Sequence, residues 1–310
     1  MDRYTFNLRK SMPLEDKVKF SKARIKEWVD HFGIDGCYIS FSGGKDSTVL
    51  LHLVRSMYPD IEAVFVDTGL EFPEVRKFVN TFPNITILRP DMRFDKVLEK
   101  YGYPIISKEI SECISQAKKC KECGKYTYRL QRALGEAKDK NGNKSKYNCE
   151  KWKDLLDAPF DISNQCCNVM KKKPAHKFYK DTGKVPFIAT LAEESRLREQ
   201  QYLKNGCNAF NNKIPTSTPI AFWTEQDILR YISENNLAIC KVYGDVLVDD
   251  KGYILTGYQR TGCMFCGFGC HLEEEPNRFQ KLKKTHPAQY NYIINDLGMG
   301  RVLDYIGVRY

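Results

Sequence analysis

The chain has 310 residues, which suits one large α/β domain or one domain with an appended subdomain. Its 49 lysines and arginines outnumber its 39 aspartates and glutamates, giving a net charge of +10 that favours anionic partners such as nucleotides or nucleic acid. No apolar run approaches the roughly 18 residues of a membrane span, and residues 1–10 contain no apolar signal-peptide core, so we predict a cytoplasmic protein with no membrane partner. In a reducing compartment, twelve cysteines indicate metal or sulfur chemistry rather than disulfide bonds.

Alternating strands and helices are expected over the first 90 residues. Residues 1–32 are predicted as an N-terminal helix segment, with Ser11 as its cap, Pro13 in its first turn and Gly33 at its end. The apolar runs at 37–39, 61–66 and 85–88 predict three strands, and helical patterns follow the first two. This alternation predicts an α/β fold with a doubly wound parallel sheet, whose ligands lie at the carboxyl ends of the strands.

A glycine-rich turn separates the first strand from its helix. The turn consists of Ser42, Gly43, Gly44, Lys45, Asp46 and Ser47. Glycines allow a sharp turn and close approach of a ligand, and the amides of the following helix favour a phosphate. The spacing is not that of a Walker loop, because the four-residue spacer before Gly-Lys-Ser/Thr is missing. The alternative is an ordinary strand-to-helix turn.

The rest of the chain is predicted as follows. The nucleotide-binding domain covers residues 33–240, with a polar, lysine-rich insertion at about 111–153, and a cysteine-containing segment covers 241–310. A further strand is expected at 185–189. A helix is expected over 225–234, with Thr224 as its cap.

Four motifs together resemble the phosphoadenosine phosphosulfate (PAPS) reductase family of adenine-nucleotide α-hydrolases. The turn at 42–47 resembles the family's PP-loop, and residues 66–74 resemble its second-strand signature, which includes Asp67. Glu194-Ser195-x-x-Arg198 resembles the Glu-Ser-x-x-Arg motif, although Leu191 stands where an arginine is usual. Residues 223–227 resemble the family's Trp-x-x-x-Asp helix start. The resemblance implies a Rossmann-like fold that binds an adenine nucleotide.

The resemblance also implies roles for the residues of the turn when ATP and Mg²⁺ are bound. The amides of Gly43 and Gly44, with Ser42 and Ser47, would cradle pyrophosphate. Lys45 would neutralise its developing charge, and Asp46 would help to hold Mg²⁺. Further candidates are Asp67, for ribose or metal, and Arg198 and Lys108, for phosphates. Both cations could equally be solvated surface charges.

Two cysteine pairs resemble the cluster ligands of iron–sulfur members of the family. They are Cys166 and Cys167, followed by Lys171, Lys172 and Lys173, and the pair Cys263 and Cys266. Four thiolates suit a [4Fe–4S] cluster, and a zinc site or buried structural cysteines are the alternatives. Cys270 could replace one ligand or act as a free sulfur carrier.

Two features favour ATP as the substrate. The sequence shows no Cys-Gly-Leu-His segment of the kind that supplies the nucleophile of sulfonucleotide reductases, and its PP-loop is intact. The leading hypothesis is therefore an ATP pyrophosphatase that adenylates an acceptor and transfers sulfur to it, with a sulfur donor protein or sulfide as the source and with Lys45, Asp46 and Cys270 as catalytic residues. The alternatives are an APS or PAPS reductase, and a nucleotide-binding module of a larger complex.

The basic insertion predicts a contact with tRNA or DNA. Residues 118–153 contain twelve lysines and arginines and four acidic residues, a net charge of +8, with interleaved aromatic rings. Cys120 and Cys123, with Cys113 or Cys149, could bind Zn²⁺. The alternative is a solvated, mobile lysine-rich loop.

Overall fold

The computed structural model describes all 310 residues and divides them into two compact units. Unit 1 contains residues 1–67, 71–89 and 174–261, and unit 2 contains residues 68–70, 90–173 and 262–310. Each unit is assembled from separate stretches, so this division differs from the one predicted from the sequence. None of the helices is long and apolar enough to cross a lipid bilayer.

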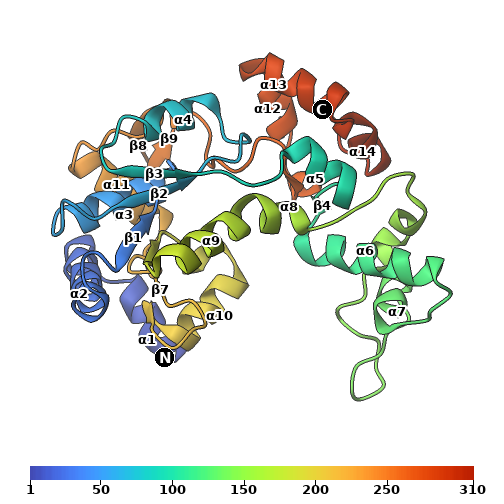
Figure 1. Cartoon of the computed structure of the whole chain (residues 1–310), viewed down its shortest axis with the longest axis horizontal. Coiled ribbons are helices and arrows are strands. Elements are labelled where there is room, and N and C mark those ends of the chain that lie inside the picture. The colour runs from blue at the N-terminus through green and yellow to red at the C-terminus, as the bar shows by residue number, and fades with distance from the viewer. The chain divides into compact units, whose positions relative to one another are not determined.

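A six-stranded, mostly parallel sheet lies at the centre of unit 1 (Figure 1). Its order is β3 (Ile85–Leu88), β2 (Ala63–Val66), β1 (Cys37–Ser40), β5 (Val185–Ile188), β7 (Thr216–Ser217) and β6 (Asn208–Ala209), with only β6 antiparallel to its neighbour. The chain winds from β1 through β2 to β3 and then returns to the other side of β1. This topology confirms the predicted doubly wound α/β fold, and it places the switch in winding direction at β1.

Alternating side chains of the sheet pack against helices on both faces. Phe187 of β5 packs against Trp28 of α2 (Leu14–Phe32), with ring centroids 6.4 Å apart. Ile39 lies opposite Phe187 in register and is fully buried. The preceding residue, Tyr38, points to the opposite face and packs against Phe178 of α9 (Lys173–Thr182) at 5.2 Å. The continuous apolar run of β1 is therefore explained by burial on both faces.

The remaining elements of unit 1 complete these layers. They are α1 (Arg3–Lys10), α3 (Lys45–Arg55), α4 (Pro73–Val79), α10 (Arg196–Asn205), α11 (Glu225–Glu234) and the hairpin of β8 (Val246–Asp249) and β9 (Gly252–Leu255). The bounds of α11 and its Thr224 cap agree with the sequence prediction. The predicted cap of the N-terminal helix is wrong, because two helices form there and α2 starts after Pro13 rather than at Ser11.

Unit 2 is mainly helical. It contains α5 (Phe94–Tyr101), α6 (Lys108–Glu122), α7 (Tyr128–Leu134), α8 (Gln165–Cys167), the π-helical turn Asn168–Lys172, α12 (Arg278–Thr285), α13 (Pro287–Asn291) and α14 (Met299–Tyr305). A short parallel pair joins β4 (Ile105–Ile106) to β10 (Gly267–Phe268). This pair fixes the segment around Cys266 to the start of α6.

The lysine-rich insertion has its own small core, which differs from the mobile-loop alternative. α6, α7 and the 3₁₀ helix Glu150–Asp157 pack together. The buried residues between them include Cys113, Ile114, Leu130, Ala133 and Cys149. Too few apolar residues form this core for their spacing to stand out among the charged residues.

A buried ion pair fixes α2 to α11 and explains Asp227 of the Trp-x-x-x-Asp motif. Lys17 Nζ lies 2.5 Å from Asp227 Oδ2, and the Lys17 side chain is only 2 % exposed. The same carboxylate accepts a hydrogen bond from the Thr224 backbone amide at 2.6 Å. Asp227 therefore has a structural role in unit 1.

We expect Asp227→Ala to lower the free energy of unfolding by about 3 kcal/mol, because it leaves a buried ammonium without its partner and removes a cap. Urea unfolding monitored by circular dichroism measures this change. Asp30→Ala is the matched control, since the Lys26–Asp30 pair is more than half exposed and solvent screening should make its contribution far smaller. Equal losses for the two variants would contradict the prediction.

Candidate functional site: a nucleotide loop and a four-cysteine pocket

The turn at 42–47 joins the end of β1 to the start of α3. Gly43 has φ +70°, and a Cβ atom at this position would lie 2.8 Å from Val75 Cγ1 and Val79 Cγ2 of α4. Glycine is therefore required for two reasons, the left-handed backbone and the close approach of α4. The turn places the first amides of α3 at the carboxyl edge of the sheet, where the helix dipole favours an anion.

Hydrogen bonds within the loop and to Tyr243 fix its shape. The hydroxyls of Ser42 and Ser47 lie 3.0 Å apart, and Ser47 Oγ donates to the Gly44 carbonyl at 2.9 Å. The Lys45 amide donates to the hydroxyl of Tyr243 at 3.1 Å, and that hydroxyl lies 2.6 Å from Thr261 Oγ1. The sequence analysis missed Tyr243 and Thr261, since no local pattern marks residues about 200 positions away.

Lys45 and Asp46 form a partly buried charged pair. Lys45 Nζ lies 3.3 Å from Asp46 Oδ1 and 3.3 Å from Glu225 Oε1. Burial alone would lower the pKa of the Lys45 ammonium, but Asp46 and Glu225 outweigh it and the pKa lies above its usual value. Burial raises the pKa of the Asp46 carboxyl, and Lys45 offsets only part of that shift. Asp46 Oδ1 is buried without a hydrogen-bond partner, and an oxygen of this kind fits a divalent cation.

Arg198 belongs to the same electrostatic environment as Asp46. Burial lowers the pKa of the Arg198 guanidinium, the charge of Arg260 acts in the same direction, and Asp46 opposes both. Arg198 forms an ion pair with Glu194, and Ser195 caps α10 by accepting a hydrogen bond from the Arg198 amide. The Glu-Ser-x-x-Arg motif thus starts a helix and places its arginine beside the loop. Arg198 also lines a cavity of about 250 Å³ in unit 1.

Asp67, at the carboxyl end of β2, contacts two arginines. Arg76 Nη2 donates to Asp67 Oδ2 at 2.8 Å, and Arg89 Nε lies 3.8 Å from the same oxygen. The position at the strand end matches the sequence prediction. Its role in binding ribose or metal stays a prediction.

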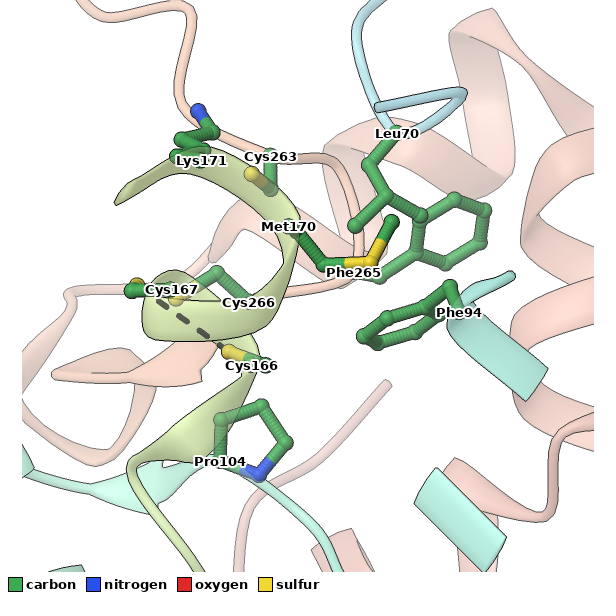
Figure 2. Close-up of a pocket in the computed structure, with 10 residues that line it drawn as sticks. All are labelled: Leu70, Phe94, Pro104, Cys166, Cys167, Met170, Lys171, Cys263, Phe265 and Cys266. Carbon is green, nitrogen blue, oxygen red and sulfur yellow. Dashed lines mark hydrogen bonds between the residues drawn. The ribbon is translucent and has the colours of Figure 1, made fainter. Parts of the chain in front are cut away.

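Unit 2 gathers the four predicted cluster ligands in one pocket (Figure 2). Cys166 and Cys167 come from α8, while Cys263 and Cys266 come from a turn closed by the bond from the Cys266 amide to the Cys263 carbonyl at 3.1 Å. In Figure 2 the cysteines gather on one side of the pocket, and Leu70, Phe94 and Phe265 face them. Pairs that are about 100 residues apart in the sequence therefore share one apolar-walled site.

The pocket favours a thiolate at Cys167. The sulfur atoms of Cys166 and Cys167 lie 4.0 Å apart, and the hydrogen bond from Cys166 is the main cause that lowers the pKa of Cys167 to about 6. Lys108, Lys171 and Lys172 act in the same direction. Lys108, predicted from the sequence to hold phosphates, thus lies near the cysteine pocket. Four thiols, apolar walls and surrounding cations fit a [4Fe–4S] cluster.

Cys270 has a different environment. It is 1 % exposed, its thiol donates to the Gly267 carbonyl at 3.0 Å, and burial raises its pKa to about 11. A sulfur carrier needs an accessible thiolate, so this environment does not favour the predicted role, which stays a prediction.

The cysteines proposed for Zn²⁺ are not gathered into one group. Cys113 Sγ lies 3.7 Å from Cys149 Sγ, Cys120 Sγ accepts a hydrogen bond from Thr127, and Cys123 is exposed. No three His, Cys, Asp or Glu side chains of the chain are close enough to hold a single metal ion. The zinc site stays a prediction.

Comparison with protein families gives a match to the phosphoadenosine phosphosulfate reductase domain over residues 36–123 and 106–268. The chain belongs to this family. The matched residues include both the nucleotide loop and the four cysteines of the pocket. The resemblance inferred from the sequence motifs is confirmed.

Several relatives of this PAPS reductase-family protein have similar sequences. The adenosine 5′-phosphosulfate reductase of Anoxybacillus flavithermus is 25 % identical over 281 residues, which cover 89 % of this chain and 92 % of that protein. The reductase of the same name from Lysinibacillus sphaericus is 25 % identical, with 73 % of this chain and 70 % of that protein covered. An uncharacterised protein of Methanocaldococcus jannaschii is 25 % identical over 81 % of this chain, but the match spans only 45 % of that protein.

Among solved structures, the phosphoadenylyl-sulfate reductase from Candida auris in its phosphate complex is similar, with a TM-score of 0.42 and 15 % identity. The alignment covers 84 % of this chain and 98 % of that chain.

Proposed function

We propose that this protein reduces an adenine sulfonucleotide, APS or PAPS, to sulfite. The observation that carries the proposal is the pocket of Cys166, Cys167, Cys263 and Cys266 in a chain that also has a nucleotide loop. Family membership and the relatives named adenosine 5′-phosphosulfate reductase support the same reaction class.

The overall reaction breaks the bond between sulfur and the oxygen that bridges it to the 5′-phosphate. The nucleotide monophosphate leaves with that oxygen, and sulfur accepts two electrons as it passes from the sulfate to the sulfite oxidation state. A dithiol supplies the electrons and becomes a disulfide. The four cysteines would hold a [4Fe–4S] cluster, which supplies redox chemistry and concentrated charge.

The residues of unit 1 would bind and orient the nucleotide. The helix N-terminus after Gly44 would accept a phosphate, and Lys45 and Arg198 would neutralise its charge. The ammonium of Lys45 is already oriented by Asp46 and Glu225, so little reorganisation is needed when an anion binds.

A second candidate is the ATP pyrophosphatase that adenylates an acceptor and passes sulfur to it. The observation that favours it is the buried Asp46 Oδ1, which has an ion-pair contact with Lys45 but no hydrogen-bond partner. A carboxylate oxygen in this position fits Mg²⁺, which would spread the charge that develops on leaving pyrophosphate. Sulfide or a persulfide donor would then supply the sulfur.

One experiment separates the two candidates. Anaerobically prepared protein is given APS or PAPS with a dithiol reductant, or ATP with Mg²⁺, and sulfite and pyrophosphate are measured in parallel. Sulfite release from APS or PAPS is the expected result. Pyrophosphate release without sulfite would establish the second candidate, and nucleotide binding without either product would indicate a binding module and overturn both.

A further inference from the structure

The basic segment 118–153 uses many of its cations to hold its own fold. Lys118 Nζ donates to the carbonyls of Ala158 and Phe160 at 3.0 and 3.2 Å. Four further cations form ion pairs, namely Lys121 with Asp157, Arg129 with Glu112, Arg132 with Glu109, and Lys144 with Glu150. These residues stabilise unit 2 and are poor candidates for binding a ligand.

Seven other lysines of the segment are exposed and form no ion pair, and three of these, Lys119, Lys151 and Lys153, lie in α6 and in the 3₁₀ helix Glu150–Asp157. The other four are Lys125, Lys138, Lys140 and Lys146. A backbone bridge pairs Lys138 with Lys144, so residues 139–143 form a tight turn between them. Asp139 Oδ1 accepts hydrogen bonds from the amides of Asn141 and Asn143 at 2.8 and 3.0 Å. The turn is therefore internally braced, and it presents lysines whose charges are not neutralised.

Exposed tyrosine rings accompany these lysines. Tyr126, Tyr128 and Tyr147 are 62 %, 51 % and 53 % exposed. Lys146 Nζ lies 5.3 Å from the centre of the Tyr147 ring. The Tyr128 hydroxyl lies 3.5 Å from Ser145 Oγ, which connects α7 to the segment that leads to Tyr147. We call these four lysines and three tyrosines the 125–147 surface.

We propose that the 125–147 surface binds single-stranded nucleic acid. Unpaired lysines attract phosphates, and ring faces beside them offer stacking positions to unpaired bases. A duplex keeps its bases stacked inside and could use only the lysines, as could an acidic protein or an anionic membrane. The exposed rings therefore favour a single strand over those partners. This inference is independent of the reaction that unit 1 and the cysteine pocket carry out.

Binding of fluorescein-labelled 20-mers of oligothymidylate and oligouridylate, measured by anisotropy across salt concentrations, tests the proposal. For a single strand the log–log salt slope changes by about 0.7 per phosphate contact. Replacing Lys125, Lys138, Lys140 and Lys146 with alanine should therefore reduce the magnitude of the log–log salt slope by up to about 3 units. The matched control replaces Lys213, Lys251, Lys281 and Lys284, which are also exposed and unpaired, and removes the same charge. It should leave the slope nearly unchanged.

Tyrosine variants distinguish a nucleic acid from any polyanion. Tyr128→Ala and Tyr147→Ala should each weaken oligonucleotide binding by about 5- to 100-fold while leaving the salt slope unchanged. The affinity for heparin, which has no bases to stack, should be the same for both tyrosine variants as for the wild-type protein. Equal slopes for the two lysine variants would overturn the proposal. So would tyrosine variants that bind the oligonucleotides normally, or a duplex that binds as tightly as a single strand. None of these outcomes bears on sulfite or pyrophosphate release.

Discussion

Lys45→Ala and Asp46→Asn should each lower turnover by about 10²- to 10³-fold, because each removes a charged group that is oriented before the substrate binds. The assay is product release from whichever nucleotide the wild-type protein consumes. Lys26→Ala is the matched control, since Lys26 is exposed on α2 and pairs only with Asp30. It should keep wild-type activity.

The free energy of unfolding of the Asp46→Asn variant distinguishes a functional role of Asp46 from a structural one. Burial raises the pKa of the Asp46 carboxyl, so the folded state holds this proton more tightly than the unfolded state does. Stability from this group is therefore greatest at pH values below the unfolded pKa and falls as the pH rises through the folded pKa. At neutral pH the ionised carboxylate opposes folding, and replacement by the neutral amide should leave the free energy of unfolding unchanged or higher. Loss of both activity and stability would show that Asp46 is structural.

The part of the nucleotide site that lies within one strand–turn–helix unit could be predicted from the sequence. The glycines, serines, Lys45 and Asp46 lie within six residues, and their spacing between a buried strand and a helix specifies the local geometry. The doubly wound sheet could be predicted for a similar reason, since β1, β2, β3 and β5 are short apolar runs, whereas the two-residue strands β6 and β7 are largely polar and gave no such signal. Tyr243 and Thr261 could not be found, because their contact with the loop depends on tertiary packing.

The motif residues show a second limit of sequence reasoning. Asp227 matched a family pattern, but the pattern does not reveal that its carboxylate is used by Lys17 and by the start of α11. The positive charge of the insertion could likewise be read from the sequence, but the sequence did not reveal which of its lysines form internal contacts and which remain exposed. Lys118 and Lys121 form contacts within unit 2, whereas Lys138 and Lys140 are exposed at the turn of residues 139–143.

Replacing any one of the four pocket cysteines with serine should remove most of the protein's iron. Wild-type protein prepared anaerobically should contain about four iron and four sulfide per chain and absorb broadly in the visible range. Serine keeps the size of the side chain but is a poor ligand for a site that suits soft thiolates. Iron and sulfide analysis with visible absorbance measures the effect, and circular dichroism tests whether the variants remain folded.

Cys270→Ser is the matched control, because Cys270 lies four residues from Cys266 but is held by the Gly267 carbonyl rather than at the pocket. It should retain iron and sulfide at wild-type levels. Loss of the cluster from this variant, with retention in Cys167→Ser, would make Cys270 the ligand instead of Cys167. A colourless wild-type protein with one zinc would contradict the cluster assignment. Sulfite release could then not depend on iron.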